Sequence, residues 1–286
     1  PAPVVLPEAR LFSHNGTIID RDNRIRADLS PDFRPPSSGH RILDYPALPA
    51  PEPVDARVFV LPTPAAWKNY FHWLVDSLPR LHDIDLRDYD RVATPLYRPY
   101  HHQTLELLDL PEGSTLEVRE WSHFRCRELV AVSPHPLHRI DGEGAAYLRN
   151  LFGVQPGRST RRLYLGRGDS WRRRILNEAA LISELDAYGF EPVLLSRMNL
   201  VEQARLLSSA EAVVAPHGAA LANLVFAPST CRVLELFPSN WAGDQYETLS
   251  RTCGLSYRTH FSENPATNPD FEVNLASLRP VLRDFV

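Results

Sequence analysis

Short apolar runs alternate with helical periods along the first half of the chain, from residue 57 to residue 153. In the helical periods, at 101–110 and 142–153, apolar residues recur every three or four positions. The runs that we expect to be strands lie at 57–61, 91–97, 115–118 and 128–132. Strands separated by helices are typical of an α/β layer, which the pattern therefore predicts here.

The alternation restarts after GVQPGRST at 153–160, a stretch with the Pro, Gly and Ser of a linker. The expected strands of this second half are 162–167, 191–195, 211–215, 232–237 and 255–261, and the helical patterns between them are 175–188, 199–209, 217–226 and 241–253. Parallel neighbours need such crossover helices, so the pattern predicts a doubly wound parallel sheet. We place a Rossmann-like domain at 158–262 and expect the tail, 263–286, to pack as a helix on the first domain.

The first 57 residues are rich in proline and polar turns, and Asn15-Gly16 between LFSH and TIID is a two-residue hairpin signal. We therefore expect a β-rich leader at the start of a first α/β domain that covers residues 1–157.

Composition narrows the function classes. The chain has 286 residues, 43% of them apolar, and a net charge of −4, so no global field favours nucleic acid or an anionic membrane. No stretch approaches the roughly 20 apolar residues of a membrane span, and three dispersed cysteines favour a reducing compartment over a disulfide framework. We expect a cytoplasmic protein, at most peripheral to the inner membrane.

The first candidate chemistry lies in NYFHWLVDSLPRL at 69–81, where His72 and Asp76 are four residues apart and share one face of a helix. Pro79 is expected to bend or restart that helix. A carboxylate beside an imidazole can act as a general base. The alternative is a solvated pair, or a core histidine satisfied by its carboxylate.

The second candidate is a basic loop after the strand RLYLGR. Seven arginines and one acid lie between Arg158 and Arg174, a net charge of +6. Arginine forks suit phosphate oxygens, and open α/β sheets bind ligands at the carboxyl ends of their strands. A solvated charged face is the alternative.

Two further candidates belong to later strands, one directly after a strand and one inside a strand. In EAVVAPHGAALANLVF, small residues at 217–220 open a helix whose N-terminal N–H groups could receive a phosphate, or they form a tightly packed turn. Glu235 interrupts the apolar run RVLELF. A ribose diol is one partner for such a carboxylate, and an edge or surface position is the alternative.

The series N-x-x-H-x-x-x-D-x-x-P-R-L, YLxR, RRxxNE, HGA and VLEL resembles, in this order over about residues 55–240, glycosyltransferase family 61. That family includes bacterial capsular-polysaccharide-type transferases, plant xylosyltransferases and animal O-linked N-acetylglucosaminyltransferases. The resemblance implies a GT-B architecture, with two Rossmann-like domains facing across a cleft. It also implies an inverting transfer from a nucleotide-sugar, expected to be a UDP-sugar, with no essential metal and no other cofactor.

The resemblance also implies roles for single residues. Asp76 is the expected base and His72 its partner, and the reverse assignment is the alternative. The expected donor-binding residues are Arg167, Arg172, Arg173, Asn177, His217, Gly218, Ala219, Asn223 and Glu235. The expected acceptor is a hydroxyl of a glycan or glycolipid, in bacterial surface polysaccharide synthesis. A nucleotide-sugar epimerase and a non-catalytic nucleotide-sugar-binding module are the alternative functions.

Overall fold

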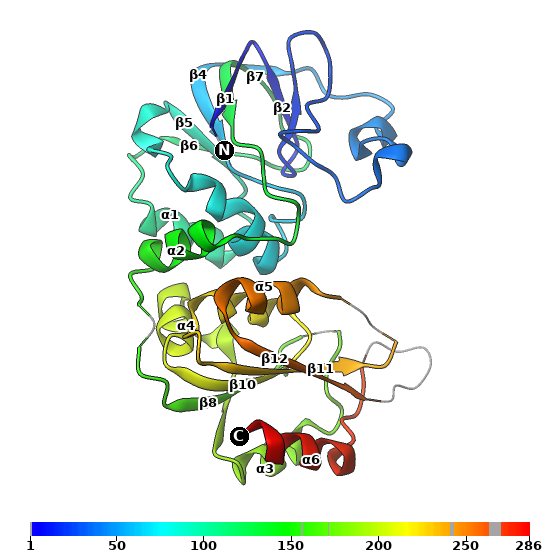
Figure 1. Ribbon diagram of the computed structural model, residues 1–286. Helices are drawn as coiled ribbons and strands as arrows, with labels where there is room; N and C mark the ends of the chain where they lie inside the picture. Colours follow the sequence, from blue (N-terminus) through cyan, green and yellow to red (C-terminus); the bar gives the residue numbers. More distant parts are fainter. Residues whose placement is uncertain (1, 156, 171, 241–242, 263–269) are drawn as a thin grey trace. The chain divides into compact units, whose positions relative to one another are not determined.

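The computed structural model describes residues 2–155, 157–170, 172–240, 243–262 and 270–286. The chain divides into two compact units, Pro1–Tyr147 and Leu148–Val286 (Figure 1). The division falls inside helix α2 (Gly142–Leu151), ahead of the expected linker at 153–160. Each unit has its own sheet with helices packed on it, so the predicted α/β class is confirmed.

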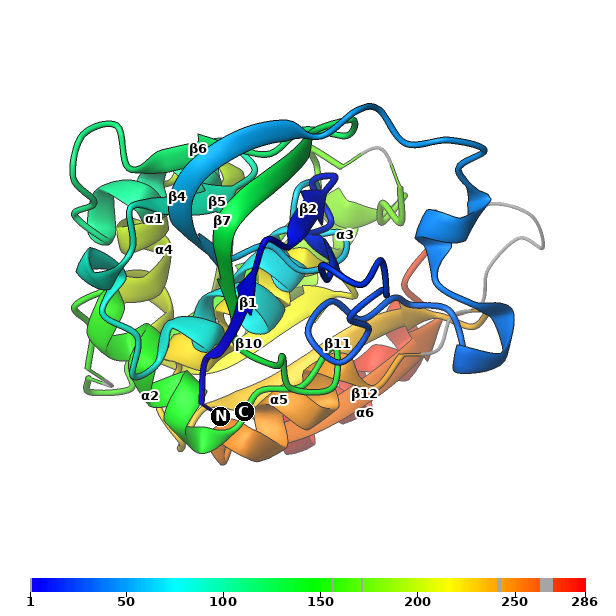
Figure 2. The same ribbon diagram turned by 90° about the horizontal axis from the view of Figure 1, so that it is seen from above.

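The first unit is built on a mixed sheet of seven strands in the order β3-β2-β7-β4-β5-β6, with β1 also paired to β7. The strands are β1 (Val4–Pro7), β2 (Arg10–Phe12), β3 (Thr17–Ile19), β4 (Glu52–Val60), β5 (Arg91–Thr94), β6 (Thr115–Glu117) and β7 (His123–Ala131). The pairs β7–β4, β4–β5 and β5–β6 are parallel, and β1 and β2 run antiparallel to β7. Figure 2 shows the long strands β4 and β7 side by side.

The expected leader is β-rich, and its hairpin differs from the prediction in one detail. β2 and β3 pair antiparallel, but Phe12 and Thr17 are the last partners, so four residues connect the strands instead of two. Gly16 closes this turn at φ +72°, and a Cβ there would lie 2.5 Å from the carbonyl oxygen of Pro62. The close approach of Pro62 therefore adds a tertiary requirement to the local preference for glycine.

The helices of the first unit include α1 (Pro99–Leu107) and two short irregular helices that follow one another, η3 (His72–Ser77), a π-helix, and η4 (Leu78–Leu81), a 3₁₀-helix. Three further 3₁₀ turns are η1 (Pro36–Ser38), η2 (Arg41–Asp44) and η5 (Leu86–Asp88). Pro79 stands at the start of η4, so the predicted restart of the helix is confirmed. Proline lacks an N–H and clashes with the carbonyl of residue i−4, which excludes a continuous α-helix.

The second unit is a five-stranded, wholly parallel sheet in the order β12-β11-β10-β8-β9. Its strands are β8 (Arg161–Leu165), β9 (Phe190–Val193), β10 (Ala210–Pro216), β11 (Arg232–Pro238) and β12 (Ser256–Ser262). The chain runs from β8 to β9 on one side and then returns to place β10 on the other side of β8. The topological switch point of the sheet therefore lies between β8 and β10.

Helices cover both faces of this sheet, as predicted. Figure 1 shows α4 (Leu200–Leu207) and α5 (Gln245–Cys253) on one face and α3 (Glu178–Asp186) and α6 (Leu275–Phe285) on the other. The segment expected to be a helix at 217–226 is the 3₁₀-helix η7 (Ala219–Phe226), and η6 (Leu195–Arg197) is a single turn.

The C-terminal helix corrects one expectation. Leu278, Leu282 and Phe285 of α6 are buried in one core cluster with Leu181 and Leu185 of α3. Helix α6 therefore packs on the sheet of the second unit, where we had expected the first domain, because its apolar stripe completes the layer that α3 begins. Residues 263–269 of that tail lie outside the described residues. Within the described part of the chain, no helix has the length and apolar character needed to cross a membrane.

Candidate functional site

The predicted His72–Asp76 pair forms inside the π-helix η3. Nδ1 of His72 lies 2.7 Å from Oδ2 of Asp76, and the two side chains are 11% and 1% exposed. An ionised carboxylate can only accept, so Nδ1 is the donor in this bond, and in the neutral tautomer that makes it the lone pair lies on Nε2. π-helical turns are frequent at functional sites. The pair is buried, so the reading as a solvated surface pair is wrong.

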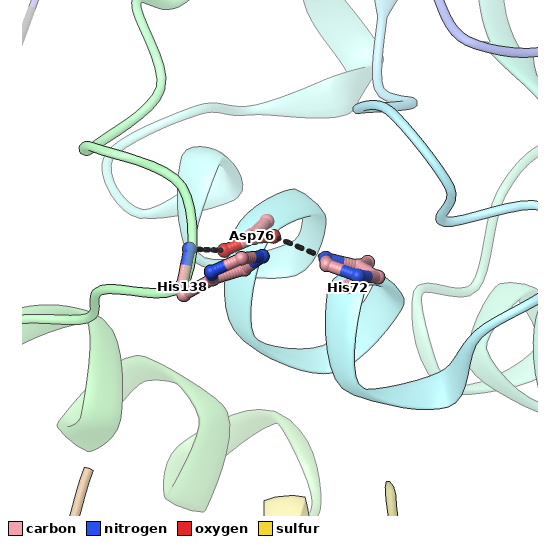
Figure 3. A group of neighbouring side chains, drawn as sticks. All are labelled: His72, Asp76 and His138. Carbon is pink, nitrogen blue, oxygen red and sulfur yellow. Dashed lines mark hydrogen bonds and ion pairs between the residues drawn. The ribbon is translucent and has the colours of Figure 1, made fainter. Parts of the chain in front are cut away.

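A third residue completes this cluster (Figure 3). The main-chain N–H of His138 donates to Oδ1 of Asp76 at 2.8 Å, and the His138 ring centroid lies 5.1 Å from that of His72. Both oxygens of Asp76 therefore already accept a hydrogen bond. An orienting carboxylate in a triad has this arrangement. The geometry favours His72 as the base and Asp76 as its partner, the assignment that the sequence offered as the alternative.

Sequence reasoning missed His138, which follows Asp76 by 62 residues. It adopts φ +69°, a left-handed conformation that is uncommon for a residue with a side chain, and this conformation directs its N–H at Asp76. The sequence signal for it is weak: a loop with two prolines and two histidines, SPHPLHRI at 133–140, directly after an apolar strand.

Arg80 supports the same region from within the core. Its guanidinium is buried and donates to the carbonyl oxygens of Leu61, Pro62 and Val132, which follow the ends of β4 and β7. Burial lowers the pKa of Arg80 to about 10, so it is charged at neutral pH. Arg80 thus satisfies main-chain acceptors where two parallel strands end, a role that the sequence did not indicate.

In the second unit, the loops after β8 and β10 meet at the switch point. The Arg167 guanidinium lies directly over Gly218: a Cβ on Gly218 would be 1.5 Å from Nη1 and 2.7 Å from Cζ. Gly218 has φ 173°, ordinary extended backbone, so the requirement for glycine is one of space. Ala219 then begins η7. The structure thus brings together residues from two of the predicted motifs, YLxR and HGA.

Arg173 is electrostatically coupled to Arg167. Burial lowers the pKa of Arg173, and the positive charge of Arg167 lowers it further. Burial also lowers the pKa of Arg167, whose buried Nε has no hydrogen-bond partner in the described part of the chain. Partial burial and the repulsion between like charges both disfavour the charged forms of these two arginines, and a bound anion would stabilise both charged forms.

Other arginines of the basic stretch have carboxylate partners. Arg174 donates to Asp270 through Nε and Nη2 at 2.9 and 2.7 Å. Arg161 pairs with Glu191 and Arg162 with Glu211. Exposed Arg172 contributes its carbonyl, which accepts from Nη2 of Arg167 at 3.2 Å. The seven-arginine stretch therefore contains structural ion pairs as well as the two coupled arginines at the switch point.

Glu178 and Tyr164, which sequence reasoning did not select as site residues, shape the Arg167 loop. Oε1 of Glu178 accepts from the Tyr164 hydroxyl at 2.8 Å and from the Arg167 N–H at 3.3 Å. A Cβ on Gly166 would lie 3.2 Å from the same oxygen. The carboxylate of the RRxxNE motif thus holds the main chain that carries Arg167.

His217 and Glu235 form a second buried histidine–carboxylate pair. Nδ1 of His217 donates to Oε1 of Glu235 at 2.5 Å, and Tyr257 donates its hydroxyl to Oε2. The Gln245 amide lies 3.2 Å from Nε2 of His217. Glu235 is 0% exposed on an interior strand, so the alternative of an edge or surface position is wrong, and both carboxylate oxygens accept hydrogen bonds from side chains of this unit. Its carboxylate holds His217 in one tautomer.

Two expected donor-binding asparagines are structural in this arrangement. Asn177 forms two hydrogen bonds with the main chain of Val273. Nδ2 of Asn177 donates to the Val273 carbonyl oxygen at 2.8 Å, and the Val273 N–H donates to Oδ1 of Asn177 at 2.9 Å. Asn223 is 0% exposed and donates to Oε1 of Gln203 and to the Ala220 carbonyl. Both amides are directed into the protein, because they satisfy buried polar groups that would otherwise be costly.

Comparison with known proteins agrees with the order of these motifs. A family model described as Glycosyltransferase 61 matches residues 70–234, more than half of the chain. The protein O-linked-mannose beta-1,4-N-acetylglucosaminyltransferase 2 of Mus musculus is 36% identical over 110 residues, which are 34% of this chain and 19% of that protein. The EGF domain-specific O-linked N-acetylglucosamine transferase of Drosophila melanogaster is 30% identical over 107 residues, 36% of this chain and 20% of that protein.

The matched segment thus spans about a fifth of the length of each relative. The family match itself begins two residues before the π-helix with His72 and Asp76 and ends inside β11, one residue before Glu235, and so includes the Arg167 loop and Gly218. On this match the chain belongs to the glycosyltransferase 61 family.

Proposed function

We propose that this chain is an inverting glycosyltransferase that moves a sugar from a nucleotide-sugar to a hydroxyl of a glycan or glycolipid acceptor. The observation that carries the proposal is the position of the Arg167 guanidinium directly over Gly218, at the switch point of a doubly wound sheet, with partly buried Arg173 close enough to interact with it electrostatically. Ligands bind such sheets at this place, and guanidinium groups suit the oxygens of a diphosphate. We further propose the GT-B arrangement, with the donor on the second unit and the acceptor on the first.

The proposed chemistry is a single displacement at the anomeric carbon. The acceptor oxygen attacks from the face opposite the diphosphate, the bond between that carbon and the diphosphate oxygen breaks, and the acceptor proton passes to Nε2 of His72. The Asp76 carboxylate stabilises the resulting imidazolium. Arg167 and Arg173 stabilise the charge that develops on the leaving diphosphate, so we expect the reaction to need no divalent metal.

The donor is proposed to be a UDP-sugar. Both relatives are named as transferases of N-acetylglucosamine, so UDP-N-acetylglucosamine is the first donor to test. A role in bacterial surface polysaccharide synthesis and a cytoplasmic location remain part of the proposal. All three cysteines are buried free thiols, which suits a reducing compartment.

The central experiment measures UDP binding and product formation on the same preparations. Arg173→Ala is expected to weaken UDP binding by roughly 1.5–3 kcal/mol, the contribution of a charge-assisted hydrogen bond. Arg161→Ala is the matched control. Arg161 pairs with Glu191 of β9, so its replacement should leave UDP affinity unchanged. Equal UDP affinity of wild type, Arg167→Ala and Arg173→Ala would refute the donor site.

The base is tested separately. His72→Ala is expected to lower turnover by about 10²–10⁴ while UDP still binds, and Asp76→Asn to lower it by no more than His72→Ala. A much larger loss in Asp76→Asn would return the base to Asp76. Activity is expected to survive EDTA, and loss that manganese or magnesium restores would contradict the metal-independent mechanism. Epimer formation from the donor alone would indicate an epimerase, and UDP binding with no product would indicate a binding module.

A further inference from the structure

The His72–Asp76–His138 cluster contains one more imidazole than a base and its orienting carboxylate require. One nitrogen from each histidine and one oxygen of Asp76 all lie within 4.8 Å of one another. Figure 3 shows the three side chains converging, two from the π-helix and one from the loop after β7. Two imidazoles and a carboxylate are a common ligand set for zinc when a water or another ligand fills the remaining position.

We propose that His72, Asp76 and His138 form a binding site for Zn²⁺ that is inhibitory. The binding of Zn²⁺ does not depend on whether the proposed glycosyl transfer is correct. Inhibition rests on the proposed function, because a metal that coordinates His72 prevents this imidazole from taking the acceptor proton.

The two oxygens of Asp76 have different roles in the proposed zinc site. Oδ1 of Asp76 accepts from the His138 N–H, so Oδ2 is the oxygen directed at the histidines. Nδ1 of His72 stands 2.7 Å from that oxygen, with one proton between them. Zn²⁺ bonds of about 2.0–2.2 Å place tetrahedral ligands about 3.3 Å apart, so a metal at this position replaces the proton with a small opening of the pair. The proton displaced from Nδ1 is carried by Nε2 of the same ring, so Nε2 no longer has a lone pair with which to accept the acceptor proton.

The surroundings favour a cation that prefers imidazole. Phe33 stacks on the His138 ring at a centroid distance of 5.6 Å and lies 5.1 Å from the His72 ring. Phe71 lies 5.9 Å from the His138 ring. These aromatic rings limit the freedom of both imidazoles and reduce water access, which strengthens coordination. Magnesium and calcium prefer several oxygen ligands, so this nitrogen-rich set selects against them.

The left-handed conformation of His138 provides a clean variant. Asparagine tolerates this conformation better than most residues, so His138→Asn removes the imidazole and keeps the main-chain N–H on Asp76. His135→Asn is the matched control: His135 lies in the same loop and pairs with Asp141 at 3.4 Å, outside the cluster.

The experiment titrates the full chain, stripped of metal, with Zn²⁺ by calorimetry and with Co²⁺ by visible absorption, in the absence of any nucleotide. One site is expected, with the Co²⁺ band of a four- or five-coordinate ion, and Zn²⁺ should raise the Tm. His138→Asn should weaken Zn²⁺ about tenfold or more, whereas His135→Asn should bind like wild type. Cooperative thermal unfolding in EDTA shows that each variant is folded.

Equal Zn²⁺ affinity of wild type and His138→Asn, or binding that never saturates, would overturn the site. His72→Gln is the second variant and should also lose the Co²⁺ band if the site is real. A separate assay compares turnover with and without Zn²⁺. Zn²⁺ that binds the cluster without slowing turnover refutes the inhibitory role, and failure to find any turnover refutes the proposed function while leaving the binding result intact.

Discussion

Gly218→Ala tests whether the position of Arg167 over Gly218 matters for the donor. An alanine Cβ would stand 1.5 Å from Nη1 of Arg167, whereas a carbon–nitrogen contact needs about 3.4 Å. The guanidinium must therefore move by about 2 Å. If Arg167 then loses one charge-assisted hydrogen bond to the diphosphate, UDP binding weakens by roughly 1.5–3 kcal/mol, or about 10- to 150-fold in Kd.

The same substitution is expected to leave the fold intact. Gly218 has extended backbone that alanine adopts freely, and replacing glycine at such a position stabilises by about 0.4–1 kcal/mol through the unfolded state. The bonds from Nη2 of Arg167 to Ser170 and the Arg172 carbonyl offset part of this gain if they break. We therefore expect the free energy of unfolding to change by no more than about 1 kcal/mol.

The assay pairs UDP titration calorimetry with urea unfolding. Gly157→Ala is the control, because a Cβ there meets its nearest atom, the carbonyl oxygen of Ser208, at an ordinary 3.5 Å. A Gly218→Ala protein with normal unfolding and a UDP Kd within twofold of wild type would refute the reasoning, since Arg167 would then not contact the diphosphate.

Two further predictions concern stability. Asn177→Ala removes both hydrogen bonds with Val273 and should lower the free energy of unfolding by about 1–3 kcal/mol without changing UDP affinity, and weakened UDP binding in a normally stable variant would restore Asn177 to the donor site. Burial lowers the pKa of His101 from 6.5 to about 4, and its ring bonds, Nδ1 from the Arg98 N–H and Nε2 to the Ala66 carbonyl, suit the neutral form. The contribution of neutral His101 to the free energy of unfolding is therefore complete above pH 6.5 and falls as the pH drops toward 4, by about 2 kcal/mol at pH 5. Urea unfolding of wild type and His101→Gln at pH 7.5 and pH 5 measures this loss of stability. An equal loss in both proteins would show that other groups are responsible.

The sequence by itself predicted the elements and the local motifs. Apolar runs separated by helical periods located the five strands of the second sheet, because the period of the side chains is a property of neighbouring residues. The spacing of His72 and Asp76 placed them on one helical face, and Pro79 marked the restart of that helix. Each of these conclusions depends on a short stretch of consecutive residues.

Tertiary structure decided which polar groups are available for chemistry. Asn177 belongs to a recognisable motif, yet its amide is occupied by Val273, 96 residues further along the chain. Glu235 is enclosed by His217 and Tyr257, and His138 reaches Asp76 across 62 residues. These pairings depend on the order of strands in a sheet and on which loops meet at its edge. Burial of apolar surface and satisfaction of buried polar groups determine that order over the whole unit, and residue spacing carries no record of it.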